Sequence, residues 1–400
     1  MNFQILQESK EETFAQKPFI FSWSFDPWTY GHESVVHDLF EIFPEAYLII
    51  LVAKNPKKQY LFTLEQRKNL IETALQKYWE KIKIEIYDGV VTQYAYLHQA
   101  RAIIKWIRDE KDSAYEIEIA RANTYFSWKV HTLLLPQLDT QVSEIRSSVT
   151  KVLFDYGADT TWLISPMIRE ALRMKKRRQF LVGITGGTGS GKTTLSRKLE
   201  EYSREKELPI YHIELDTIVY ELYQKPETPL QRNIRSQMLQ LFSREIIDAD
   251  DTLNRKILAD IIFSDTVKKQ QLEKILGEAF LYMLSQKVQS ITTPGIILLD
   301  WALFVEYQKT DVCDENMILM WVPENMQRER ILSRDMLSPE QADARIQHQL
   351  SFSQRKEYLL SRKQFHPQQF FYHIEWQEFS LEDIYKSIAG RYLALQQSFQ

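Results

Sequence analysis

Residues 186–193 read GGTGSGKT, and this stretch decides the fold of the second half of the chain. The apolar run 180–184 precedes it, and a helical pattern begins at 194–199. A strand, a glycine-rich turn and a helix in this order meet the P-loop spacing G-x-x-x-x-G-K-[ST]. Backbone N–H groups of such a loop surround phosphate oxygens, and its glycines remove Cβ clashes. The sequence therefore predicts a nucleoside triphosphate site.

Two side chains after the glycines carry the chemistry expected of this motif. Lys192 would reach the β- and γ-phosphates, and Thr193 would hold Mg²⁺. The other predicted ATP contacts of the loop are Gly187, Thr188, Gly189, Ser190, Gly191 and Thr194. A glycine-rich turn without a ligand is the alternative, and the complete motif in its strand-to-helix setting disfavours it. The motif does not indicate what receives the phosphate.

Length and composition describe a globular chain of more than one domain. At 400 residues, two or three domains are expected, and 44% hydrophobic with 26% charged residues is typical of packed cores. A net charge of -4 gives no general attraction to nucleic acid or acidic membranes. One cysteine, Cys313, excludes an internal disulfide and a cysteine-based zinc site, and favours a reducing compartment.

The sequence shows neither a signal peptide nor a membrane span. Residues 1–17 form a polar, charged leader where a signal peptide would need an apolar core. The longest apolar run, 46–53, is far shorter than the ~20 residues that a spanning helix needs. We therefore expect a cytoplasmic protein with no membrane partner.

Strand and helix patterns alternate through the first half of the chain. Apolar runs at 18–23, 47–53 and 82–87 predict strands, and helical spacing separates them. Alternation of this kind indicates a parallel sheet with covering helices, here a Rossmann-like domain.

A basic run, 175–178, comes directly before the P-loop strand and marks a boundary. A solvated helix end or linker explains it better than nucleic-acid or lipid binding does. We predict an α/β domain over 18–172, a basic linker over 173–179, and a P-loop α/β domain with helical additions over 180–400.

Two further signals in the second half fit a kinase. Residues 211–216 read YHIELD, a strand that ends in acidic residues, and strand C-termini line the ligand crevice of doubly wound sheets. Asp216 could there accept a proton from a substrate hydroxyl or orient Mg²⁺, and a helix N-cap is the alternative. Arg328, Arg330 and Arg334 lie on a predicted helix, either as solvated ion pairs or as cations over a transferring phosphoryl group.

Taken together, these motifs resemble dephospho-coenzyme A kinases over about residues 180–360. The segments that carry the resemblance are GITGGTGSGKTT at 183–194, ELD at 214–216, LNRKIL at 253–258, LFVE at 303–306, and the side chains of Arg330, Arg334 and Gln349.

The resemblance implies a role for each matched residue. Asp216 would activate the ribose 3′-hydroxyl and Lys192 would stabilise the phosphates, while Arg255 would bind the acceptor. Arg330 and Arg334 would belong to a closing lid. The chain departs from the family at Gly277 and Glu278, where His-Pro is expected, and at Ala302, where proline is expected.

Residues 24–32 read SFDPWTYGH and place hydroxyls, a proline turn, a glycine and His32 between a strand and a helix. A histidine and backbone N–H groups at a helix start suit the stabilisation of charge on a reacting phosphate. Cations or hydroxyls follow at 55–58, 101–108 and 146–148. Each cluster alone would be an ordinary surface, and together they predict a phosphate-rich pocket.

This half resembles the T/H-x-G-H nucleotidyltransferases, most closely the bacterial-type phosphopantetheine adenylyltransferases, over about 18–165. The resemblance implies that the phosphate of 4′-phosphopantetheine attacks the α-phosphorus of ATP in line and releases pyrophosphate. His32 and Lys58 would stabilise the transition state, and Ser24 would position the attacking phosphate. The residues implied to contact ATP are Ser24, Phe25, His32, Arg108, Glu116, Ser147 and Ser148.

The first half also departs from its family. Trp23 and Trp106 stand where the family has glycines, and Arg146 stands where it has a serine. A tryptophan adds bulk where a close backbone approach is expected.

The two resemblances are complementary, because the product of one activity is the acceptor of the other, in the domain order of the fused coenzyme A synthases of animals. We therefore expect a bifunctional enzyme for the last two steps of coenzyme A biosynthesis, with ATP, 4′-phosphopantetheine and dephospho-coenzyme A as partners and Mg²⁺ as cofactor.

Two other interpretations stay open at this point. One is a nicotinamide-nucleotide adenylyltransferase fused to a nucleoside kinase. The other is an active kinase whose N-terminal half has become a binding or regulatory module, and Trp23, Trp106 and Arg146 motivate it.

Overall fold

The computed structural model describes residues 17–55, 58–107, 110–125, 130–136, 145–224, 226–254, 257–258, 261, 265–335, 338–375 and 380–399. Residues 1–16 of the predicted leader lie outside this range. The chain forms two compact units, one of residues up to Phe154 with Thr160–Arg169, the other of Asp155–Asp159 with Glu170–Ser398. Each unit is described by itself below.

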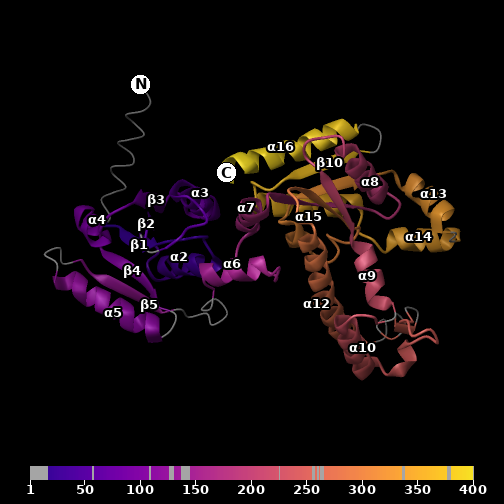
Figure 1. Ribbon diagram of the computed structural model, residues 1–400, viewed down its shortest axis with the longest axis horizontal. Helices are drawn as coiled ribbons and strands as arrows, with labels where there is room; N and C mark the ends of the chain where they lie inside the picture. The colour runs from indigo at the N-terminus through magenta and orange to yellow at the C-terminus, as the bar shows by residue number, and fades with distance from the viewer. Residues whose placement is uncertain are drawn as a thin grey trace. The chain divides into compact units, whose positions relative to one another are not determined.

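The N-terminal unit is a parallel sheet covered by helices. Its described strands lie in the order β3-β2-β1-β4-β5 (Figure 1). Successive strands are therefore added on one side of β1 up to β3 and on the other side from β4 onward. The strands are β1 (Phe19–Trp23), β2 (Leu48–Ala53), β3 (Ile82–Tyr87), β4 (Ala102–Ile107) and β5 (Thr132–Pro136). The helices are α2 (Tyr30–Ile42), α3 (Leu64–Ala74), η1 (Gln76–Tyr78), α4 (Val91–Leu97), α5 (Glu110–Tyr125) and α6 (Ser147–Asp155).

The pairing register shows that two central strands, β1 and β4, separate toward their carboxyl ends. β1 pairs with β2 along its whole length, up to Trp23 opposite Val52. With β4 it pairs only from Phe19 to Phe21, so the two strands separate beyond that point. In open α/β sheets, ligands bind at such a switch point.

Local sequence explains where the covering helices begin. Thr63 is the N-cap of α3, and its hydroxyl accepts from the backbone N–H of Gln66 while the Gln66 side chain accepts from the backbone N–H of Thr63. This capping box fixes the start of α3 at Leu64. The inward residues of α2 (Val35, Val36 and Leu39) are buried, as their helical spacing indicates.

The C-terminal unit contains a second parallel sheet, in the order β10-β9-β6-β8-β7, with the P-loop strand at its centre. Its strands are β6 (Gln179–Gly186), β7 (Ile210–Glu214), β8 (Gly295–Asp300), β9 (Met317–Trp321) and β10 (Phe371–Glu375). Every residue of β6 and of β8 is buried, which explains the apolar runs 180–184 and 296–299 within them.

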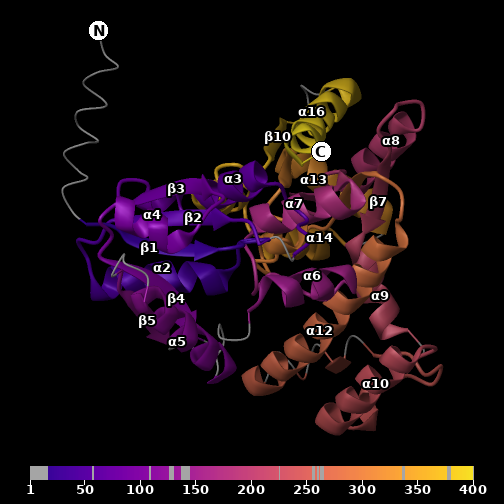
Figure 2. The same cartoon turned by 60° about the vertical axis from the view of Figure 1, so that its left-hand side comes forward.

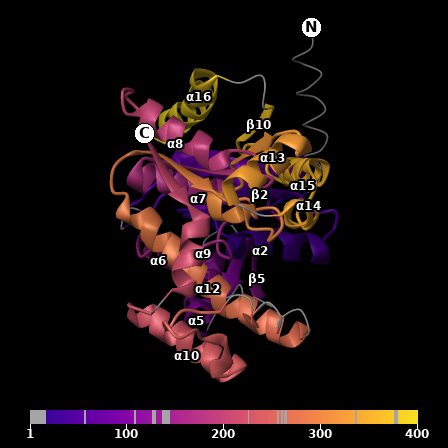
Figure 3. The same cartoon turned by 90° about the vertical axis from the view of Figure 1, so that its right-hand side faces the viewer.

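Helices surround this sheet and also extend beyond it. They are α7 (Pro166–Arg177), α8 (Lys192–Ser203), α9 (Leu215–Tyr223), α10 (Pro229–Phe242), η2 (Arg244–Ile246), α12 (Thr266–Ser290), η3 (Thr310–Cys313), α13 (Glu324–Asp335), α14 (Pro339–Gln347), α15 (Phe352–Phe365) and α16 (Leu381–Phe399). α10 and α12 lie side by side in a helical lobe that continues from α9, as Figures 2 and 3 show.

One apolar core joins the lobe to the sheet, and among its buried members are Met238 of α10, Leu284 of α12 and Leu299 of β8. The predicted fold class, two parallel-sheet α/β domains of which the second carries helical additions, is confirmed. No described helix is both long enough and apolar enough to cross a membrane.

Candidate active sites

The P-loop of the C-terminal unit has the backbone that its glycines predict. Gly189 and Gly191 have φ of +78° and +91°, in the left-handed region where a Cβ is unfavourable. Gly191 is also the N-cap of α8, so the helix begins at Lys192 and directs its N-terminal N–H groups toward the loop. A methyl group on Gly187 would lie 2.4 Å from Oε1 of Gln327.

Lys192 is buried and folded against the loop. Its Nζ donates to the carbonyl oxygens of Gly186 and Gly187, both at 3.1 Å, and lies 3.4 Å from Oγ of Ser190. Burial lowers the pKa of Lys192 to about 8, while the charges of Asp300 and Asp216 oppose that fall. The ammonium group is thus held among acceptors that a phosphate could replace.

Two carboxylates from neighbouring strands lie near Lys192. Asp216 is in the first turn of α9, directly after β7, and Asp300 is the last residue of β8, opposite Glu214. Asp216 is exposed overall, but partial burial of its carboxyl group raises its pKa. Asp300 and Glu214 add to the rise in pKa, and Lys192 opposes it. A carboxylate of raised pKa is a better proton acceptor.

Asp300 is 2% exposed, and its Oδ2 accepts no hydrogen bond from any described residue. Nε2 of His212 lies 3.6 Å from that oxygen. A buried carboxylate oxygen without a donor, on a residue whose charge acts on Lys192, suits a cation or an ordered water.

The helices after β9 lie over the P-loop. Nη1 of Arg330 donates to the carbonyl oxygens of Gly189 (3.1 Å) and Ser190 (3.3 Å). Oε1 of Gln349 accepts from the backbone N–H of Thr188 at 2.8 Å, and its Nε2 lies 2.6 Å from the Thr188 hydroxyl. Arg334 is exposed on the last turn of α13. The structure thus brings Arg330 and Gln349 onto the loop directly.

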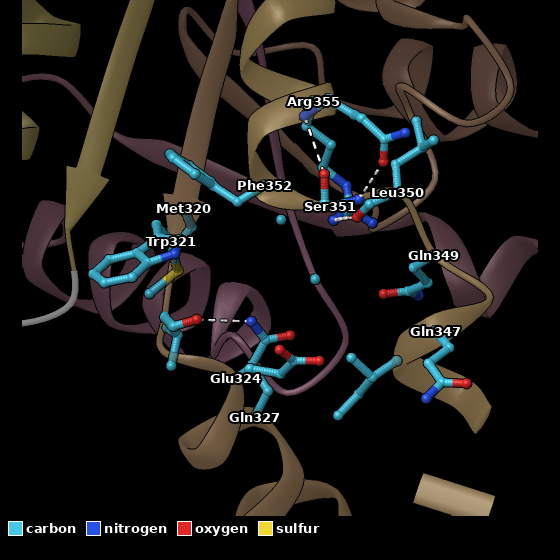
Figure 4. A pocket seen from close by; sticks show the side chains of 15 residues that line it. Met320, Trp321, Glu324, Gln327, Gln347, Gln349, Leu350, Ser351, Phe352 and Arg355 are labelled. Carbon is cyan, nitrogen blue, oxygen red and sulfur yellow. Dashed lines mark hydrogen bonds between the residues drawn. The ribbon is translucent and has the colours of Figure 1, made fainter. Parts of the chain in front are cut away.

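A cavity of about 390 Å³ lies between the loop and these helices. Figure 4 shows Trp321 and Phe352 on one side of it and Gln347 and Gln349 on the other. The rings of Trp321 and Phe352 have centroids 6.0 Å apart. Arg355 also lines the cavity, is 3% exposed, and pairs with Glu306. Aromatic walls and side-chain amides suit a flat polar ring.

The second site is in the N-terminal unit, at the switch point between β1 and β4. Thr29 is the N-cap of α2 and His32 is in its first turn. The backbone N–H of Thr29 donates to Nδ1 of His32 at 3.0 Å, and Oγ1 of Thr29 lies 2.9 Å from the same nitrogen. A ring nitrogen that accepts from an N–H carries no proton, so the neutral imidazole carries its proton on Nε2. His32 can therefore donate from Nε2.

Aromatic side chains enclose this imidazole, which is 3% exposed. The ring centroids of Phe25, Trp28 and Trp106 lie 5.2, 5.3 and 6.1 Å from that of His32. The tryptophan that replaces a family glycine at 106 is thus part of the site.

Asp26 ties the loop before α2 to two other segments. Its carboxylate accepts from the backbone N–H groups of Leu61 and Phe62, both at 3.0 Å, and pairs with Lys151 at 2.7 Å. The hydroxyl of Ser147 donates to the carbonyl oxygen of Pro27 at 2.8 Å. Ser147, predicted to contact ATP, here supports the His32 loop.

The other predicted N-terminal residues lie in varied settings. Ser24 Oγ is 3.4 Å from the hydroxyl of Tyr60, and Phe25 is fully buried. Lys58 and Ser148 are exposed. Glu116 is 4% exposed and pairs with Lys105 at 3.4 Å. Arg108 and Arg255, predicted to bind ATP and the acceptor, lie outside the described residues.

Comparisons with known proteins identify both units. A family model described as cytidylyltransferase-like matches residues 20–160. A phosphopantetheine adenylyltransferase of Thermotoga neapolitana is 31% identical over 156 residues, which is 39% of this chain and 94% of the relative. One of Coprothermobacter proteolyticus is 30% identical over 158 residues, again 39% and 94%. The chain belongs to the phosphopantetheine adenylyltransferase family.

A second family model, described as dephospho-CoA kinase, matches residues 180–359. A solved dephospho-CoA kinase structure from Campylobacter jejuni is 18% identical, and the match covers 55% of this chain and 99% of that chain at a TM-score of 0.28. The chain thus joins a phosphopantetheine adenylyltransferase to a dephospho-CoA kinase domain, and it is an enzyme, a nucleotidyltransferase and a kinase that use ATP.

These matches confirm the two family resemblances and do not favour the nicotinamide-nucleotide or binding-module interpretations. The structure adds Asp300, Arg355 and Gln327 to the P-loop site of the C-terminal unit. The sequence singled out none of these three residues. Asp300 had a signal, because it ends an apolar strand next to Asp216 in a parallel sheet. Arg355 had none, because its approach depends on how α15 packs.

Proposed function

We propose that the chain carries out the last two steps of coenzyme A biosynthesis. The N-terminal unit transfers an adenylyl group from ATP to 4′-phosphopantetheine, and the C-terminal unit phosphorylates the ribose 3′-hydroxyl of dephospho-coenzyme A. One observation carries the proposal: both halves match families, and the first family's product is the second family's acceptor. The corresponding domains are 18–172 and 180–400, joined by 173–179.

In the first step, the phosphate oxygen of 4′-phosphopantetheine forms a bond to the α-phosphorus of ATP while the bond to pyrophosphate breaks. His32 donates from Nε2 to the α-phosphate, where negative charge gathers in the transition state. Lys58 adds a cation, Ser24 positions the attacking phosphate, and positioning with charge stabilisation is sufficient for the reaction. Phe25, Arg108, Glu116, Ser147 and Ser148 complete the proposed ATP site.

In the second step, Asp216 accepts the proton of the ribose 3′-hydroxyl. The hydroxyl oxygen forms a bond to the γ-phosphorus of ATP while the bond to ADP breaks. The raised pKa of Asp216 supports that role. Lys192 moves from the loop carbonyls to the phosphates, and Arg330 and Arg334 neutralise charge from the lid. The cavity beside Trp321 and Phe352 receives the base of ATP.

The donors near the P-loop fit Mg²⁺. Thr193 supplies a hydroxyl in the first turn of α8, and Asp216 and Asp300 supply carboxylates, of which Oδ2 of Asp300 has no donor among the described residues. When bound, the ion would neutralise charge on the β- and γ-phosphates.

Two separate assays test the proposal. Purified chain with ATP and 4′-phosphopantetheine should release pyrophosphate, and with ATP and dephospho-coenzyme A it should form ADP. Nicotinamide mononucleotide in place of 4′-phosphopantetheine is the matched negative substrate. Absence of pyrophosphate release in protein that still forms ADP would reject the first activity, and robust turnover of nicotinamide mononucleotide would replace it.

A further inference from the structure

Trp106 stands at the carboxyl end of β4, where the strand no longer pairs with β1. It is 2% exposed and lies in register with Leu135 of β5. Side chains alternate between the faces of a strand, so Trp106 and Lys105 point to opposite faces of the sheet. A large apolar side chain is therefore fixed at the switch point, where ligands of this fold bind.

The indole reaches the start of α2 because Gly31 has no side chain. A Cβ on Gly31 would lie 2.6 Å from Cη2 of Trp106, closer than any carbon contact allows. The backbone oxygen of Ile145 would lie 3.0 Å from the same Cβ. The space vacated at Gly31 thus accommodates the bulk added at Trp106.

The residue after Gly31 is His32. The ring of Trp106 packs against the imidazole with an angle of 61° between the two ring planes. Phe25 and Trp28, the other rings around the imidazole, belong to the same loop as the N-cap Thr29. Trp106 comes from β4 instead, so it links the imidazole to the opposite side of the switch point. Without that wall, the ring would gain freedom to rotate and lose the bond from Thr29 to Nδ1.

We propose that Trp106, packed against Gly31, is a positioning residue for His32 in adenylyl transfer. It touches neither reacting atom. It holds the imidazole so that Nδ1 keeps the bond from Thr29 and Nε2 keeps its proton for the α-phosphate. This inference rests on the proposed role of His32 in the N-terminal unit.

The test uses the full chain, whose kinase activity reports the concentration of folded protein. Trp106→Gly should lower kcat for pyrophosphate release about 10- to 100-fold with a smaller change in KM, since a shift of about 1 Å at a reacting group can cost about 100-fold. Trp106→Phe should restore most of kcat, because a ring still walls the imidazole. Trp79→Gly, a 72% exposed tryptophan of the same unit, is the matched control and should leave kcat unchanged.

Gly31→Ala is a second variant that tests the same proposal, and its result does not depend on whether Trp106→Gly folds. Its methyl group should displace the indole and lower kcat by a similar factor, yet add no further loss in the Trp106→Gly background. Losses that multiply in the double variant would overturn the coupling between the two residues.

Imidazole ¹⁵N resonances give a readout that needs no substrate. Wild-type His32 should show a protonated Nε2 and an unprotonated Nδ1, and Trp106→Gly should show a mixture of tautomers. If Trp106→Gly only lowers the melting temperature, with kcat and tautomer unchanged, Trp106 is structural and the proposal fails. If the wild-type chain releases no pyrophosphate, the proposed function fails, and the tautomer measurement still decides the positioning role.

Discussion

The two sites hold their key side chains by different kinds of force. Rings from Phe25, Trp28 and Trp106 enclose His32, and the backbone N–H of Thr29, which donates to Nδ1, sets its tautomer. Around Lys192, by contrast, the neighbours are carbonyl oxygens of the P-loop and the carboxylates of Asp216 and Asp300. One site is an apolar box around a neutral donor, and the other is a set of charges and dipoles.

The difference follows from what each group must do. A neutral imidazole that donates one hydrogen bond needs a fixed direction, which close packing supplies. A lysine that follows a moving phosphoryl group needs alternative acceptors, and the loop carbonyls supply them until phosphate arrives. Steric changes should therefore disable the first site and charge changes the second.

The largest effect is expected for Lys192→Ala. Loss of the ammonium group leaves charge on the transferring phosphoryl group without its buried cation, so kcat/KM for ADP formation should fall about 1000-fold. Pyrophosphate release should stay at its wild-type rate. Lys198→Ala on the exposed side of α8 is the control, and an equal loss in that variant would mean that the helix rather than the ammonium group matters.

His32→Ala should act in the opposite way and somewhat more weakly. Removal of one preorganised donor should reduce kcat for pyrophosphate release about 100-fold, while ADP formation is unchanged. His37, 55% exposed on the same helix, offers His37→Ala as the matched control. If His32→Ala retained full pyrophosphate release, the role assigned to His32 would be contradicted.

The smallest effect is expected on the stability of the C-terminal unit, at a buried carboxyl group outside both sites. Glu170 of α7 is 2% exposed, accepts from Asn316 at 3.0 Å, and pairs with Arg391 of α16 at 2.8 Å. Burial raises the pKa of Glu170 from 4.5 to about 7, with Asp314 adding to the rise. The folded C-terminal unit therefore binds a proton more tightly than the unfolded chain does.

A carboxyl group whose pKa is raised by folding stabilises the folded state at pH values below its pKa in the unfolded chain. This stabilisation is lost as the pH rises from about 4.5 through about 7. Glu170→Gln cannot ionise, so between pH 5 and 8 it should gain about 1–3 kcal/mol relative to wild type. Thermal or urea unfolding of the C-terminal unit at several pH values measures this, with exposed Glu278→Gln as control. Parallel pH profiles for wild type and Glu170→Gln would show that Glu170 does not titrate in this range.

The sequence predicted the parts of the sites that are local in the chain. The P-loop spacing located Lys192 and the glycines whose left-handed φ values the structure shows, and the Thr-x-Gly-His segment located the start of α2. Among residues distant in the chain, the end of a predicted strand pointed to Asp216 and a predicted helix pointed to Arg330. Gln349 was found only because a family pattern pointed to it. Asp300 and Arg355 were missed, because their approach to Lys192 depends on the pairing of β8 with β6 and on the packing of α15.

By itself, the sequence determined two α/β domains, a phosphate loop, and a histidine at a helix start, because strand and helix periodicity and glycine conformation are set by neighbouring residues. Only the tertiary structure decided what the tryptophan at position 106 means. The sequence suggested that Trp106 obstructs a close approach, and the structure places it against Gly31, beside His32. Whether bulk blocks a site or supports it depends on the space opposite, which belongs to residues far away in the chain.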